Sequence, residues 1–348
     1  MKLAFLAICT CPLIALSTAD LASTYSQGET RTTEYSVEES SSLVDLSVLM
    51  NGEDSGMPGD MQQEKSRTFS GTFTDTILRA SDGEVSSFSR TYADLEDETS
   101  ASMSGPMGDQ NMDSWGESDL DGLTVLFTKE EGGGFVATFP EDESGDDELL
   151  EGLEALLPWA EFLTDENVKI DDEWNIEPFA LWNALNLGGN LSFVSNGDEG
   201  MLMSQDAAAA SGHSLRDAMT VDGEITASLI SIEDGIANFT LALEVDVVQD
   251  LSEAMRALAE EQIGNAPDGA MMPDIETLED AREYEGEGTV LWHIDGGYMV
   301  SMELSLEFTE TQSMVMSMSM GPDEMSIDQT LTSEGETELL VEVEVTRE

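Results

Sequence analysis

Apolar residues recur at every second position over long stretches of this chain. The clearest case is residues 223–248, where a turn signal, Asp234-Gly235, separates two alternating runs. The first run holds Ile225, Ala227 and Leu229, and the second holds Phe239, Leu241, Leu243 and Val245. Alternation with period two puts these side chains on one face of a strand, and Asp-Gly favours the tight turn of a β-hairpin. These residues therefore predict an antiparallel pair with one buried face.

The same pattern predicts hairpins over residues 68–95, 122–139 and 286–311, and strands at 313–320 and 336–345. Residues 96–118 are polar and predict a loop. We therefore expect an α+β fold, mainly antiparallel β. Its form is a long curved sheet or an open half-barrel with a few packed helices.

The middle of the chain has helical signals instead. Ser144 and Asp147 have capping-box spacing, Leu149, Leu150 and Leu153 begin an apolar helical face, and Pro158 ends it. Pro178 opens a second helix that stops at Gly188-Gly189, and residues 250–264 predict a third. The expected regions are a β-hairpin region at 20–145, a helical segment at 146–190 and a β-rich region with one helix at 191–348. These regions share one core or form separate ones.

Residues 1–19 have the pattern of a secretory signal peptide. Lys2 precedes an apolar run at 3–16, and the small residues Ser17-Thr18-Ala19 follow. Both cysteines, Cys9 and Cys11, lie in this segment, so the mature chain is expected to lack disulfides and thiolate ligands. We predict a secreted, periplasmic or cell-envelope location.

The charge excludes several partners. The chain has 74 acidic and 12 basic residues, for a net charge of −62. Nucleic acid and anionic membrane surfaces would be repelled. Two interpretations remain: a solvated acidic surface adapted to salt, or weak binding of divalent cations, for instance at residues 117–128 or 141–148.

Residues for catalysis are scarce. The only histidines, His213 and His293, are far apart in sequence, and His293 has the setting of an ordinary strand residue. No metal-ligand motif, phosphate loop or serine-nucleophile motif is present. We therefore predict no catalytic residue, no metal site, no cofactor and no enzyme. A hydrolase with a histidine or an acid pair in an apolar cleft is the alternative.

Four methionines share one strand parity: Met314, Met316, Met318 and Met320. Thioethers bind Cu(I), but methionine also lines adaptable apolar surfaces. We favour the wall of a core or cavity and keep copper as the alternative. The candidate ligand cavity is bounded by these methionines and by the helical segment with Trp182 and Trp174.

Four segments, at residues 82–98, 119–128, 172–193 and 285–308, carry a resemblance. In them the chain resembles a group of uncharacterised secreted proteins of planctomycete-type bacteria. The resemblance implies relatives without an assigned activity, so no site residue is carried over. The expected function is non-enzymatic binding of a hydrophobic ligand or of a partner protein in the cell envelope. A structural or interaction protein without a cavity is the alternative.

Overall fold

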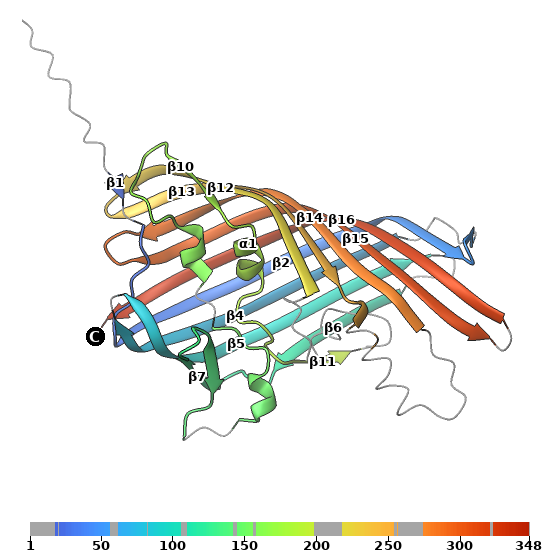
Figure 1. Cartoon of the computed structure of the whole chain (residues 1–348), viewed down its shortest axis with the longest axis horizontal. Coiled ribbons are helices and arrows are strands. Elements are labelled where there is room, and N and C mark those ends of the chain that lie inside the picture. The colour runs from blue at the N-terminus through green and yellow to red at the C-terminus, as the bar shows by residue number, and fades with distance from the viewer. Residues whose placement is uncertain are drawn as a thin grey trace, which may run out of the picture.

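The structure is a computed structural model that describes residues 18–19, 21–55, 62–81, 83–105, 110–141, 145–155, 158–197, 218–253, 256, 274–320 and 323–347. Most of these residues are in strands of one large sheet (Figure 1). The long strands are β2 (Glu29–Met50), β4 (Gln62–Ser81), β5 (Glu84–Ser104), β12 (Met219–Glu233), β13 (Ile236–Asp250), β14 (Asp274–His293), β15 (Tyr298–Met320) and β16 (Asp323–Arg347). The short strands are β1 (Thr18–Ala19), β3 (Glu53–Asp54), β6 (Gln110–Ser118), β7 (Thr124–Lys129), β8 (Phe135–Thr138), β9 (Val168–Lys169), β10 (Glu173–Ile176) and β11 (Phe193–Gly197). The expectation of a mainly antiparallel, open, curved sheet is confirmed.

The 14-stranded sheet has the order β10-β12-β13-β14-β15-β16-β2-β4-β5-β6-β11, with β3, β7 and β8 attached to it. Long neighbours in sequence pair as hairpins. The exception is the pairing of the last long strand, β16, with the first, β2, in the middle of the sheet. The N-terminal and C-terminal β regions therefore belong to one sheet.

The turn chemistry of the sequence is borne out at the β12–β13 hairpin. Asp234 and Gly235 both have positive φ, at 50° and 81°. Positive φ at both central residues is the requirement of the type I′ turn, whose twist matches that of paired strands. This turn sets the register in which Ala227 pairs with Leu241 and Leu229 pairs with Phe239.

The core lies on one face of the sheet, which we call the covered face. The segments at residues 145–155 and 158–193, with α1 (Phe179–Leu185), cross this face near one end of the strands (Figure 1). Their contact with the sheet includes a hydrogen bond in which Tyr35 Oη donates to the carbonyl of Ala184 (3.0 Å). Phe73, Tyr92 and Trp292 are among the large side chains buried there. We call the opposite face the open face.

The prediction of a helix that starts near Asp147 is wrong. The chain forms two short 3-10 helices, η1 (Asp147–Leu150) and η2 (Pro158–Phe162), with an isolated bridge between Leu153 and Gly189. Gly152 has φ +76°, which a right-handed helix excludes. The cap is Asp146, whose carboxylate accepts a hydrogen bond from the N–H of Glu148. The leucines instead pack against the core from an irregular chain.

The predicted loop at residues 96–118 is also wrong, because β5 continues to Ser104 and β6 begins at Gln110. These strands run beyond the core, so they carry polar residues on both faces while their backbones pair. The helix after Pro178 is confirmed as α1. Most of the predicted helix at 250–264, and residues 1–17 of the predicted signal peptide, lie outside the described residues.

β1, at the end of that predicted peptide, pairs with β9. Within the described part of the chain, no helix combines the length and the apolar character needed to cross a bilayer.

Candidate functional site

The predicted cavity residues form two separate groups. Trp174 is buried on β10 and Trp182 packs against the core from α1. The row of paired residues that starts at Trp174 reaches β15 at Leu304. Met314 is ten residues further along β15, or about 33 Å at the rise of an extended strand. The structure therefore does not bring the tryptophans and the methionines to one cavity.

The methionines belong to a second apolar area on the covered face. Met314 and Met316 follow Leu306 and Phe308 with the same parity on β15, so their side chains point to the same side. Six half-buried side chains from three neighbouring strands make up this area. We call it the methionine surface: Met314, Met316, Ile327, Leu331, Leu46 and Val48. The side chains of Met318 and Met320 lie outside the described part.

The register gives the copper alternative no support among the described side chains. The residues opposite Met314 and Met316 on β16 are Gln329 and Ile327, not methionines. Of the methionines that could complete a sulfur cluster from neighbouring positions, Met299 and Met302 are buried in the core. Half-buried Met325 on β16 lies opposite Met318, whose side chain is outside the described part. Because Met314 and Met316 are two residues apart on one extended strand, their thioethers alone do not surround a metal position.

A cluster of charges lies between the core and the methionine surface, also on the covered face. Its centre is Arg282 of β14, which donates to Glu310 Oε1 (2.8 Å) and Glu39 Oε2 (3.1 Å). The guanidinium also forms an ion pair with Asp280 Oδ2 (3.8 Å) and donates to Tyr284 Oη (3.4 Å). We call these five residues the Arg282 cluster. It joins β14 and β15 to β2 across the intervening strand β16.

Burial and neighbouring charge shift the pKa values of this cluster in opposite directions. Burial, with a smaller contribution from Glu310, raises the pKa of Asp280 to about 6, although Arg282 opposes the shift. Burial would also raise the pKa of Glu310, but Arg282 and Lys65 lower it below its ordinary value. At neutral pH both carboxyls are ionised, and Asp280 is the first to take up a proton as the pH falls.

We expect the raised pKa of Asp280 to lower stability as the pH rises from about 4 to 6. In that window the folded chain keeps a proton that the unfolded chain, with an ordinary aspartate pKa near 4, has released. Each pH unit then lowers the free energy of unfolding by about 1.4 kcal/mol, which amounts to roughly 2–3 kcal/mol over the whole window. Urea unfolding of Asp280→Asn across pH 4–7 should show this one-proton slope removed. Asp246→Asn, an exposed change of equal charge, should leave it in place, and identical profiles for the two variants would refute the assignment.

Two buried oxygens of this region have no partner among the described residues. They are Oδ1 of Asp280 and Oγ1 of Thr337, and the two residues are 5% and 2% exposed. Thr337 lies directly opposite Glu39 in the β16–β2 pairing. A buried polar atom without a hydrogen bond is costly. The pairing puts Asp280 opposite Gln312 and Thr337 opposite Leu306 on β15, so the two oxygens lie about 20 Å apart along the strands and mark separate positions. Arg282 Nε, a donor of the Arg282 cluster, is also buried without a hydrogen-bond partner among the described residues.

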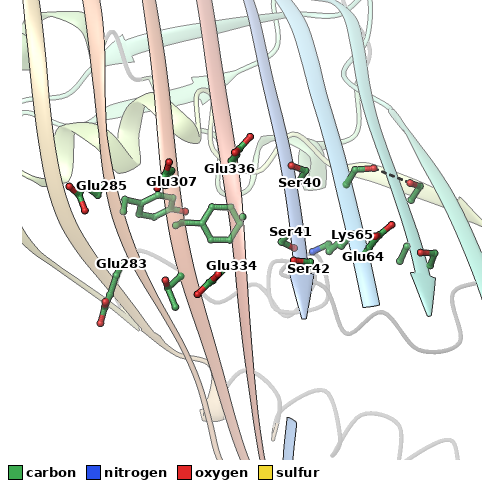
Figure 2. A pocket seen from close by; sticks show the side chains of 18 of the residues that line it. Ser40, Ser41, Ser42, Glu64, Lys65, Glu283, Glu285, Glu307, Glu334 and Glu336 are labelled. Atoms are coloured by element: carbon green, nitrogen blue, oxygen red, sulfur yellow. Dashed lines mark hydrogen bonds between the residues drawn. The ribbon is translucent and has the colours of Figure 1, made fainter. Parts of the chain in front are cut away.

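The open face carries a wide polar groove of about 1120 Å³ (Figure 2). Nine acidic residues are among those that line it, and the one basic lining residue, Lys65, has the strand parity of the covered face. The register aligns five glutamates, one on each of five adjacent strands, in a single row: Glu224, Glu244, Glu285, Glu307 and Glu336. Adjacent strands are about 4.8 Å apart, so these carboxylates repel one another unless cations lie between them.

Two stretches were expected as weak calcium sites. An acidic residue of the first has another role, and the second lies partly outside the described residues. Asp121, in the turn at 119–122, accepts a hydrogen bond from the N–H of Leu95 (3.2 Å). Residues 142–144 of the second stretch are not described. In the described ranges no three His, Cys, Asp or Glu side chains are arranged to hold a metal ion.

The histidine that the structure describes has a structural role. His293 Nδ1 accepts a hydrogen bond from the N–H of Gly296 (2.9 Å), and its ring stacks on Tyr298. His213 lies outside the described residues. No protein-family model and no curated protein matches this chain. The function is therefore argued from the geometry of the two faces.

The Arg282 cluster is the part of the site that sequence reasoning missed. The sequence did contain a signal for this cluster. Charged residues stand at strand positions where the alternation predicts buried apolar residues. Asp280, Arg282 and Glu310 have the same strand parity as buried Val290 and Phe308 of their own strands. A charged residue at an inward position has to find a buried partner, and three such residues on neighbouring strands indicate a cluster.

Proposed function

We propose that this chain is a secreted, non-enzymatic protein of the cell envelope that binds a hydrophobic ligand or an apolar segment of a partner protein. The observation that carries the proposal is the methionine surface. It presents six partly exposed apolar side chains on the covered face, beyond the part of the sheet that α1 crosses. Apolar areas that stay partly exposed in a folded chain commonly mark ligand or partner sites.

The composition of the surface suits a ligand of variable shape. Methionine is unbranched and polarizable, so it adapts to irregular apolar partners. Leu331 and Leu46 face each other, and Gln329, opposite Val48, leaves one polar group within the area. The neighbouring strand β14 adds buried Ile275 and Leu278 along its side.

Met316→Glu should weaken the binding of a neutral apolar fluorophore, N-phenyl-1-naphthylamine, by at least tenfold. The reason is that an apolar ligand on this surface would bury the new carboxylate without a partner, at a cost of several kcal/mol. Fluorescence titration measures the affinity. Leu340→Glu is the matched control, because Leu340 is 45% exposed on the open face of the same strand pair. Equal affinities for the two variants, or no binding by the wild type, would leave the structural-protein alternative.

Weak binding of divalent cations is the second proposal, supported by the glutamate row on the open face. Calcium between adjacent carboxylates would relieve their repulsion. Millimolar calcium should then raise the melting temperature of the wild type more than that of Glu285→Gln/Glu307→Gln. An equal rise in both proteins, measured by differential scanning calorimetry, would indicate general screening of charge instead of binding.

A further inference from the structure

We infer that the ligand of the methionine surface is an amphiphile with a protonated amine at one end, and that the Arg282 cluster holds this amine. The inference rests on the proposed function, because it assumes that the methionine surface receives the apolar part of the same molecule. The inference adds the chemical class of the ligand, and it adds the orientation of the ligand along the strands of the sheet.

The first argument is the charge of the cluster. Three carboxyl groups, those of Asp280, Glu310 and Glu39, share the one guanidinium of Arg282. The ammonium of Lys65 is close enough to lower the pKa values of Asp280 and Glu310. Arg67, opposite Glu39 on β4, is balanced by its own two-bond ion pair with Asp97. The cluster therefore has three negative charges against two positive ones, and one more cation would neutralise it.

The second argument is independent of charge and concerns hydrogen bonds. Among the described residues, Asp280 Oδ1 is buried and lacks a hydrogen-bond partner. A carboxylate oxygen only accepts hydrogen bonds, so it needs a donor. A protonated amine brings three N–H donors together with a positive charge, so it would supply both deficits of the cluster. An anionic or purely apolar group would supply neither.

The third argument is the position of the cluster relative to the methionine surface. Glu310, Gln312, Met314 and Met316 follow one another on the covered face of β15 at alternate positions. Met314 is four residues from Glu310, or about 13 Å along the strand. The side chains of Glu310 and Glu39 are 20% and 16% exposed, so the cluster can be approached. An amine at Glu310 would direct its apolar chain along the methionines.

The experiment compares three probes with a twelve-carbon chain: dodecylamine, a nonionic dodecyl ether and dodecyl sulfate. Binding is measured by isothermal titration calorimetry at pH 7 and 0.15 M salt, below the aggregation concentration of each probe. We expect dodecylamine to bind the wild type at least tenfold more tightly than the nonionic ether, and dodecyl sulfate to bind most weakly. In Asp280→Asn/Glu310→Gln the preference for the amine should fall below threefold, while the affinity for the ether stays the same.

The matched control is Glu285→Gln/Glu307→Gln on the open face, which removes the same two charges. It should keep the tenfold preference. An amine preference that survives in the cluster variant, or that the control variant loses equally, would reflect the overall negative charge and overturn the inference. Tight binding of the ether without any preference would overturn the inference and leave the proposed function standing. Failure of every probe to bind the wild type would overturn both.

Two further measurements cover the case in which the double variant does not fold. Glu39→Gln removes a member of the cluster that is more exposed than Asp280 and should lower the amine preference at least threefold. A pH series on the unchanged protein should show the preference declining below about pH 6, because Asp280 then takes up a proton. The titratable and charged groups that face this position among the described residues are Asp280, Glu310, Glu39, Tyr284, Arg282 and Lys65. A preference that is constant from pH 7.5 to 5 would count against the inference.

Discussion

Replacement of Arg90 by methionine is expected to lower the free energy of unfolding by about 3–5 kcal/mol, the cost of leaving one partner of a buried ion pair alone. Arg90 Nε and Nη2 donate to the two carboxylate oxygens of Asp75, at 2.7 and 2.9 Å. The two side chains are 2% and 5% exposed. Without Arg90, Asp75 would have to remain charged and desolvated or to bind a proton, and either choice destabilises the folded state.

The surroundings of Arg90 add to this loss. Its guanidinium carbon lies within 6 Å of the ring centroids of Phe73, Phe88 and Phe127. These are favourable cation–π distances, and the contacts are stronger when they are removed from water. Arg90→Lys is therefore expected to recover only part of the stability, because an ammonium cannot form the paired hydrogen bonds.

A matched pair in the same sheet separates burial from geometry. Arg67 and Asp97 form the same two-bond arrangement, at 2.9 and 2.7 Å, but the Arg67 side chain is 36% exposed. Arg67→Met should cost less, about 1–2 kcal/mol, because Arg67 is partly open to water, although the Asp97 side chain that it leaves is only 9% exposed. Urea unfolding followed by circular dichroism measures all the variants. Equal losses for Arg90→Met and Arg67→Met would contradict the argument, and Arg90→Met/Asp75→Leu should recover most of the lost stability.

Replacement of Arg282 by methionine is the second large effect that we expect, also about 3–5 kcal/mol at pH 7. Arg282 is the group that the carboxyls of Asp280, Glu310 and Glu39 share. Its loss would leave three carboxyls close together in a region of low exposure, and Phe308 would lose the guanidinium that lies over its ring. The contact that joins β14 and β15 to β2 would be lost as well.

The cost of Arg282→Met should depend on pH. At pH 5 the carboxyl of Asp280, with a pKa of about 6, is mostly protonated, so fewer charges are left unpaired. The loss should be smaller there than at pH 7, whereas the loss for Arg67→Met should change little. Urea unfolding at both pH values gives the comparison. A loss of equal size at pH 5 and pH 7 would show that Arg282 stabilises the sheet by packing and not by charge.

Several elements could be predicted from neighbouring residues alone. The hairpin at Asp234-Gly235 was predicted because turn conformation and side-chain alternation are local properties. Helix α1 after Pro178 was predicted for the same reason, since a proline at the start and glycines at the end bound it. The leucines at 149–153 led to a wrong helix prediction, because leucines at this spacing also occur in an irregular segment that covers a sheet. Gly152, whose positive φ a right-handed helix excludes, decides for the irregular segment.

The candidate site could be predicted only in part. Met314 and Met316 were correctly placed on one face of a strand by their parity, and the side chains of Met318 and Met320 lie outside the described residues. The separation of the methionines from Trp174 and Trp182 could not be predicted, because it depends on which residues of distant strands pair. A register is set by long-range pairing and by bulges, such as those at Leu291/Trp292 and Thr332/Ser333.

The sequence by itself determined the strands, their buried parity, the tight turns and the acidic character of this protein. These follow from interactions between residues that are close in the chain. Only the tertiary structure decided that β16 pairs with β2, that α1 covers one end of a single sheet, and that Arg282 meets Glu39 across 243 positions of sequence. The physical reason is that a side chain's partner in a sheet is chosen by the register between strands, and no local pattern contains that register.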